Sequence, residues 1–150
     1  MKGLVFEELY NEISVVTVEG GNVMYGYKKQ VNLSYEKAVS KVREELKKEG
    51  FGVLTEINVK DTLKSKLNVD YEDYIILGAC NPPFAYQALQ VEKGVGLMMP
   101  CNIIVYADNG KIFVSAAMPT TLMSLIENDK LKSTAQQIEG KLKKVVDNVA

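Results

Sequence analysis

Two patterns predict an α+β fold with helices packed largely on one face of a sheet. In the first two thirds of the chain, segments with helical periodicity alternate with strand-like runs. Further on, Asp108-Asn109-Gly110 separates two β-rich runs, 102–107 and 111–118. Asn-Gly between such runs predicts a tight hairpin, and therefore antiparallel pairing. A length of 150 residues favours a single domain.

The first 22 residues are open to two interpretations. Their first half has the apolar spacing of one helical face, whereas 13–18 (ISVVTV) is rich in β-formers. The run 23–31 that follows predicts a strand with Tyr25 and Tyr27 on the same face, because strand side chains alternate.

The clearest helix is expected to begin after Ser34, a good N-cap, and to end at Gly50. Its apolar residues recur at the spacing of one helical face: Tyr35, Val39, Val42 and Leu46. Alternating apolar residues then predict a strand at 51–59, and Asp61 is a candidate N-cap for a short helix through Leu67.

The continuous apolar run from Tyr74 to Cys80 predicts a strand covered on both faces. Pro82 begins a Pro-Pro pair suited to the first turn of a helix. After the hairpin, 120–128 is expected to be helical, and 130–149 predicts a last helix with an inward apolar face.

Composition excludes several classes of function. With 18 basic and 19 acidic residues, the net charge is −1, and no basic surplus points to nucleic acid. No run approaches the length of a membrane span, and the acidic N-terminus does not resemble a signal peptide. We therefore expect a cytoplasmic protein that does not associate with a membrane, and we expect its cysteines to be free thiols.

The chain contains no histidine. The chain therefore lacks the commonest general base, and it cannot form a Ser-His-Asp triad or a Cys-His dyad by itself. Two cysteines without histidine also do not complete a four-ligand zinc site in one protomer, so no metal is predicted.

The two cysteines, Cys80 and Cys101, are the first site candidates. Both lie at strand ends, in the echoing contexts GACNPP and MMPCNII. Cys80 also precedes a predicted helix, whose N-terminal dipole favours a thiolate. Neighbouring strands would bring the thiols together to pair or to share a ligand; alternatively, both are small buried hydrophobes.

Three polar residues accompany them. Asn81 suits a cap or Asx turn, whereas Asn102 lies in a strand-forming run where asparagine is disfavoured. The two amides either support neighbouring loops or point into a shared pocket. Glu56 interrupts an apolar strand and is either a half-buried acid or base or a solvent-facing residue.

Several unusual motifs, in a fixed order, resemble the domain-of-unknown-function 302 family. They are GFGVLTEINV at 50–59, YIILGACNP at 74–82, AYQAL at 85–89 and LMMPCN at 97–102. The resemblance covers about 34–119. Residues 1–22 look like an N-terminal extension, and three positions depart from the family pattern: Asn58, Asn68 and Met99.

The resemblance implies a curved, mainly antiparallel sheet backed by helices, similar to the TATA-binding-protein-like class, in compact and often dimeric proteins. It implies no agreed activity and no known cofactor. The family motif residues fall at Glu56, Cys80, Asn81, Pro82, Pro100, Cys101 and Asn102.

Three hypotheses for function follow. The first is a small-molecule or cofactor binding module with a site at the Cys80 and Cys101 strand ends. The second is a thiol-based redox or sulfur-transfer protein that uses the same two cysteines. The third is a homodimeric interaction module. The sequence does not decide whether the protein is an enzyme.

Overall fold

The structure is a computed structural model that describes the backbone of residues 13–18 and 21–150 and the side chains from residue 24 onward. Its strands are β1 (Ile13–Val18), β2 (Gly21–Val31), β3 (Gly52–Asn58), β4 (Tyr74–Cys80), β5 (Cys101–Asp108) and β6 (Lys111–Ala117). Its α-helices are α2 (Tyr35–Lys48), α3 (Val59–Leu67), α4 (Pro82–Val91), α5 (Pro119–Leu122) and α6 (Asp129–Val149). Two short 3₁₀ turns are η1 (Lys93–Met98) and η2 (Met123–Leu125).

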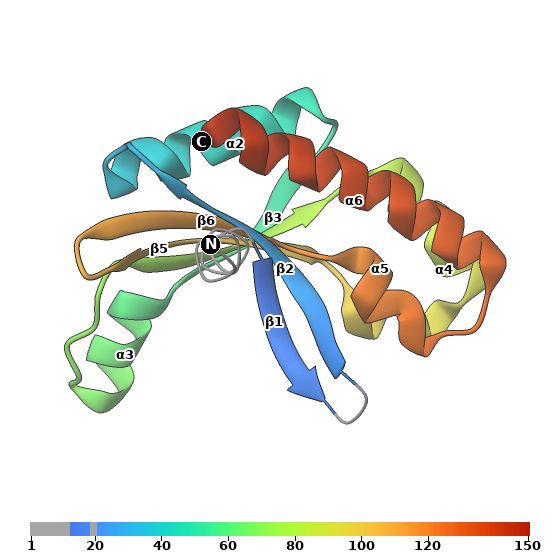
Figure 1. Ribbon diagram of the computed structural model, residues 1–150, viewed down its shortest axis with the longest axis horizontal. Coiled ribbons are helices and arrows are strands. Elements are labelled where there is room, and N and C mark those ends of the chain that lie inside the picture. The colour runs from blue at the N-terminus through green and yellow to red at the C-terminus, as the bar shows by residue number, and fades with distance from the viewer. Residues whose placement is uncertain (1–12, 19–20) are drawn as a thin grey trace, which may run out of the picture.

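The strands described form one sheet in the order β1-β2-β6-β5-β4-β3, and every neighbouring pair is antiparallel. Helices α2 and α6 lie side by side across one face of the sheet (Figure 1). The predicted α+β class, with an antiparallel sheet and its main helices on one face, is confirmed.

The main hydrophobic core fills the space between this helical layer and the sheet. Its buried side chains include Leu46 from α2, Leu77 from β4, Ile103 from β5 and Leu142 from α6. A smaller cluster is formed by Ala88 of α4, Val95 of η1 and Leu131 of α6. The candidate site lies between these two clusters, at the end of the sheet near α4.

Local sequence signals account for several element boundaries. Ser34 caps α2 by accepting a hydrogen bond from the Lys37 backbone N–H at 3.2 Å. Gly50 ends the same segment with a φ of 83°, a conformation that costs glycine little. The Asn109-Gly110 turn joins β5 to β6, and both of its residues have positive φ.

Two predicted helix boundaries were wrong. Helix α3 begins at Val59 directly after β3, and Asn58 is its N-cap, because its side-chain oxygen accepts the backbone N–H of Asp61 at 3.0 Å. The segment expected as one helix at 120–128 is instead the single turn α5 followed by η2. Asn128 is the N-cap of α6 and accepts the Lys130 backbone N–H.

The prediction that β4 is covered on both faces was also wrong. Ile75, Leu77 and Ala79 are buried against the helical layer, whereas Tyr74 and Ile76 are only partly buried on the opposite face. A row of aromatic rings crosses that opposite face: Tyr71, Tyr74, Tyr106 and Phe113, with centroids of successive rings 5.3–6.4 Å apart. We call this row the aromatic face.

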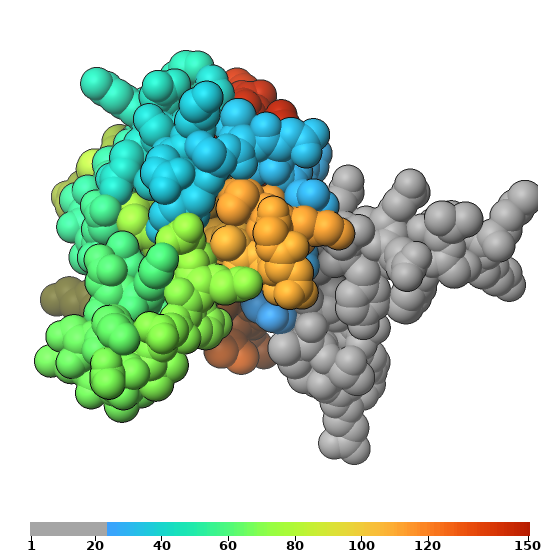
Figure 2. Space-filling model, turned by 90° about the vertical axis from the view of Figure 1, so that its left-hand side faces the viewer, coloured from blue at the N-terminus to red at the C-terminus, as the bar shows by residue number. Residues whose placement is uncertain are grey.

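Seen from the end of the molecule, α2 lies above the β5–β6 turn, and α3 with the loop after it lies below (Figure 2). Helix α3 thus stands on the side of the sheet opposite α2, beyond the ends of β3 and β4 (Figure 1). The helical layer itself consists of α2 and α6.

A β-bulge separates Tyr25 from Tyr27. In the pairing of β1 with β2, Ser14 opposes Gly26 and Val15 opposes Met24, so Tyr25 is the extra residue. The Tyr27 hydroxyl donates to Asp147 of α6 at 2.7 Å, on the helical side. Tyr25 interacts electrostatically with Tyr74 and Tyr106 of the aromatic face. The expectation that Tyr25 and Tyr27 share a face was therefore wrong.

The strand interpretation of 13–18 agrees with β1. The helical interpretation of the first residues falls on 1–12, outside the described residues, as do 19–20. In the part of the chain that the structure describes, no helix is long and apolar enough to cross a membrane.

Candidate functional site

The two cysteine-bearing strand ends lie next to each other. Strand β4 ends at Cys80 and the antiparallel β5 begins at Cys101, with Ala79 directly opposite Cys101. Both thiols line one cavity of about 310 Å³. We call it the thiol cavity.

The thiol cavity exists because small side chains face one another where three elements converge. Its wall includes Ala79 from β4, Ala85 and Ala88 from α4, and Ala135 from α6. Larger apolar side chains close the remainder: Phe51, Leu54, Phe84, Leu89, Met99, Pro100, Met123 and Ile138. Among the residues that the structure describes, none with a charged side chain lines the cavity, so its interior suits an uncharged, apolar group.

Asn81 holds the corner between β4 and α4. Its side chain is 8% exposed, and its amide nitrogen donates to the backbone carbonyl of Glu49 at 3.1 Å. It makes no side-chain hydrogen bond to the helix that it precedes. Asn81 therefore ties the start of α4 to the end of α2, and it also contributes to the cavity wall.

Burial changes the acid–base chemistry of Cys101. Desolvation, with a smaller contribution from Cys80, raises the pKa of the Cys101 thiol from 9.0 to about 11. At neutral pH this thiol is protonated, a state that neither attacks electrophiles nor binds soft metals well. The two cysteines are free thiols, not a disulfide.

The other two predicted site residues lie elsewhere. Asn102 is exposed and pairs with Gly78, on the face of the sheet opposite Cys101. Glu56 is 50% exposed and forms an ion pair with Arg43 of α2 at 2.7 Å. The structure brings Cys80, Cys101 and Asn81 together, and it leaves Asn102 and Glu56 outside the cavity.

Several cavity residues had no signal in the sequence. Thr134 and Ile138 are ordinary positions on an amphipathic helix, and Met123 lies in a turn. Only the close approach of α6 to α4 gives them a shared role. Met99 precedes Pro100 in the motif LMMPCN at 97–102, but nothing in that motif predicts that the Met99 side chain lines a cavity.

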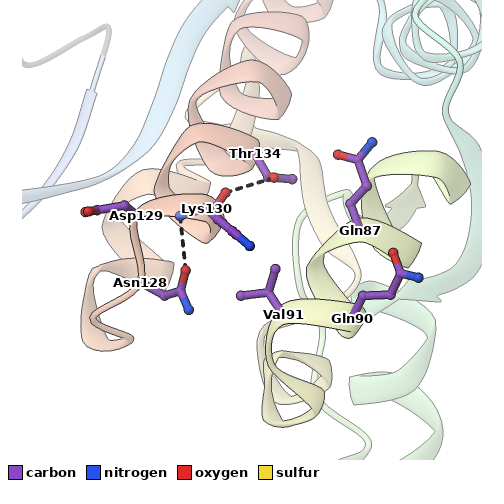
Figure 3. Close-up of a pocket in the computed structure, with 7 residues that line it drawn as sticks. All are labelled: Gln87, Gln90, Val91, Asn128, Asp129, Lys130 and Thr134. Atoms are coloured by element: carbon purple, nitrogen blue, oxygen red, sulfur yellow. Dashed lines mark hydrogen bonds between the residues drawn. The ribbon is translucent and has the colours of Figure 1, made fainter.

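An open polar cleft adjoins the thiol cavity (Figure 3). It runs between α4, which contributes Gln87, Gln90 and Val91, and the first turns of α6. From α6 come Asn128, Asp129, Lys130 and Thr134. Thr134 lines both the cleft and the thiol cavity, so the two spaces are neighbours at this residue. Among the described residues, no group of three or more Cys, Asp and Glu side chains is placed to hold a metal ion.

Comparisons with known proteins agree with the fold. Residues 27–149 match a family model described as "Domain of unknown function DUF302". The chain is also similar to the crystal structure of an uncharacterized conserved protein DUF302 from Bacillus stearothermophilus, with 32% identity and a TM-score of 0.81. That match covers 85% of this chain and 100% of the other. No curated protein matches the chain.

Proposed function

Because the chain belongs to the DUF302 family of unknown function, we propose a function from its site: binding of an apolar small molecule in the thiol cavity. The observation that carries the proposal is a cavity of about 310 Å³ lined almost entirely by apolar side chains. Its volume lies at the lower end of the range of ligand sites in proteins. A protein interior otherwise packs with few voids of this size.

A neutral fluorophore, N-phenyl-1-naphthylamine, tests the proposal because its emission rises when it leaves water. We expect saturable binding to the wild type and at least tenfold weaker binding to Ala85→Leu, which fills part of the cavity. Gln137→Leu is the matched control, since it adds the same side chain to α6 at an exposed position away from the cavity.

Two results would contradict the proposal. One is the absence of saturable fluorescence with the folded wild type. The other is equal binding by Ala85→Leu and the wild type. Thermal unfolding of each variant shows whether it is folded, so a loss of binding is not confused with a loss of structure.

A thiol-based redox or sulfur-transfer function is the alternative for the same site. The shared cavity of Cys80 and Cys101 favours it. The raised pKa of Cys101 opposes it, because a protonated thiol is a poor nucleophile. Alkylation by iodoacetamide at neutral pH decides between them: two thiols that react only after unfolding exclude the redox function.

We further propose that the protein is a homodimer in a reducing compartment such as the cytoplasm. Free thiols are typical of such a compartment. The aromatic face supports the dimer, because aromatic residues are enriched at protein interfaces and three of its four rings, those of Tyr71, Tyr74 and Tyr106, are at least partly accessible. A dimer of this kind would leave the thiol cavity accessible, since the cavity lies at the end of the sheet on the helical side.

A further inference from the structure

The chemistry around the mouth of the thiol cavity points to a particular class of ligand. The cavity is apolar, whereas the cleft that shares Thr134 with it is lined mainly by amides and charged groups. A molecule that extended from one space into the other would meet apolar walls at one end and hydrogen-bond donors at the other. Such a molecule is an amphiphile with a single apolar chain.

The donors in the cleft favour a negatively charged end. In Figure 3 the Lys130 side chain points across the gap toward α4, where Gln87 and Gln90 lie. No described residue forms an ion pair with the Lys130 ammonium group. Asp129 belongs to the same turn, but its carboxylate points away from α4 (Figure 3). The Asn128 side chain is already used as the N-cap of α6.

A second depression beside the cavity is less suited to an anion. It shares Met123 and Ala135 with the thiol cavity, and its charged side chains are Glu127, Asp129 and Lys132. Two carboxylates against one ammonium group oppose the approach of another negative charge. The cleft with Lys130 is therefore the favoured place for an anionic end.

We infer that the ligand is a medium-chain carboxylate, whose chain fills the thiol cavity and whose carboxylate lies in the cleft beside Lys130. A cavity of about 310 Å³ has room for an alkyl chain of medium length, of which we take the ten-carbon chain as the representative. Gln87 and Gln90 line the α4 side of the same cleft. This inference rests on the proposed function of the cavity and adds the class of ligand.

Three ligands of equal chain length test it: decanoate, decanol and decylamine, each in competition with bound N-phenyl-1-naphthylamine. We expect decanoate to compete better than decylamine. Lys130→Gln should weaken decanoate about fivefold, the effect of one exposed ion pair, and leave decanol unchanged. Lys37→Gln is the matched control, since it removes an exposed lysine from the first turn of α2, far from both spaces.

The outcomes separate the two proposals. If Lys130→Gln leaves decanoate binding unchanged, or weakens decanol equally, the carboxylate site is refuted while the cavity function stands. If Ala85→Leu does not weaken any of the three, the chain does not occupy the cavity and the inference fails. If the wild type binds the fluorophore but none of the three displaces it, only the ligand class is wrong. If nothing binds, including the fluorophore, both proposals fail.

Discussion

Single side chains in this protein differ widely in how the fold changes their acid–base chemistry. Cys101 is partly buried in the thiol cavity, where no cation is found among the described lining residues, so its neutral form is favoured. Glu45 is more deeply buried, with 3% of its surface exposed, but Lys41 and Lys48 contact its carboxylate at 3.1 and 2.8 Å. Its charged form is favoured instead. The two residues show that the partner, rather than burial alone, decides the direction of a pKa shift.

The Cys101 thiol makes stability depend on alkaline pH. Its folded-state pKa of about 11 lies above the ordinary value of 9.0, so the folded state holds its proton more tightly. The contribution is complete below pH 9.0 and is lost as the pH rises through about 11, at a cost of about 3 kcal/mol. Denaturant unfolding across this range should show a smaller alkaline loss for Cys101→Ala than for the wild type. Equal losses in the two proteins would contradict the assignment.

Glu45 has the opposite effect at acidic pH. Hydrogen bonds from Lys48 and then Lys41 lower the pKa of its carboxyl from 4.5 to about 2. The stability that its charge supplies is complete above pH 4.5 and is lost as the pH falls through about 2. We expect Glu45→Gln to lower the free energy of unfolding by about 1 kcal/mol near neutral pH. The difference from the wild type should shrink on acidification.

Glu44→Gln provides the control for this measurement. Glu44 is exposed, and its carboxylate lies 3.9 Å from the same Lys41 ammonium group. Its removal should change stability by less than about 0.5 kcal/mol at any pH. A pH dependence as large as that of Glu45→Gln would show that general surface charge, not the buried carboxylate, is responsible.

At the scale of elements, close contact between β4 and its neighbours depends on one glycine. Gly78 lies between Thr55 of β3 and Asn102 of β5. A Cβ atom at this position would overlap the Thr55 hydroxyl and lie 2.7 Å from the Pro100 ring. The segment before β5, which forms part of the cavity wall, can therefore pack against β4 only if residue 78 has no side chain.

Gly78→Ala should consequently destabilise the protein by about 1–3 kcal/mol, the usual range for overpacking. Chemical denaturation measures this change directly. Gly52→Ala is a matched substitution on the neighbouring strand, where a Cβ atom meets nothing within 4 Å, and we expect it to have little effect. If both variants are as stable as the wild type, the contact with Pro100 is not as tight as described.

Local signals predicted most elements but not their faces. Ser34 and Gly50 bound α2 through side-chain and backbone preferences that act within a few residues. The bulge at Tyr25, in contrast, exists only because β1 pairs with β2 in a particular register. The alternation of side chains along β5 could have separated two of the site candidates. Cys101 and Asn102 are adjacent in one strand, so their side chains point to opposite faces of the sheet and do not both line one cavity.

At the scale of the whole molecule, the sheet separates two surfaces with different proposed roles. The thiol cavity lies on the helical side, where α4 and α6 meet the end of the sheet. The aromatic face lies on the opposite side of the same strands. Binding of a small molecule and association of two protomers would therefore use separate parts of the fold.

Association through the aromatic face predicts a specific response to mutation. Tyr106→Lys places a charge in the middle of the ring row, so we expect at least a tenfold weaker dimer in sedimentation velocity experiments. Tyr86→Lys makes the same change at an exposed position on α4, 65% accessible, and should leave the dimer intact. A wild-type protein that is monomeric at all concentrations would contradict the proposed dimer.

The α+β class, the Asn-Gly hairpin and the amphipathic helices could be predicted from the order of the amino acids, because periodicity, caps and turns act between residues near one another in the chain. It also identified Cys80 and Cys101 by their similar contexts at strand ends. The residues that surround the thiols became known from the folded arrangement of the helices and strands. Thr134 belongs to both the cavity and the cleft because α6 packs against α4, and contacts across such distances in the chain leave no local pattern to read.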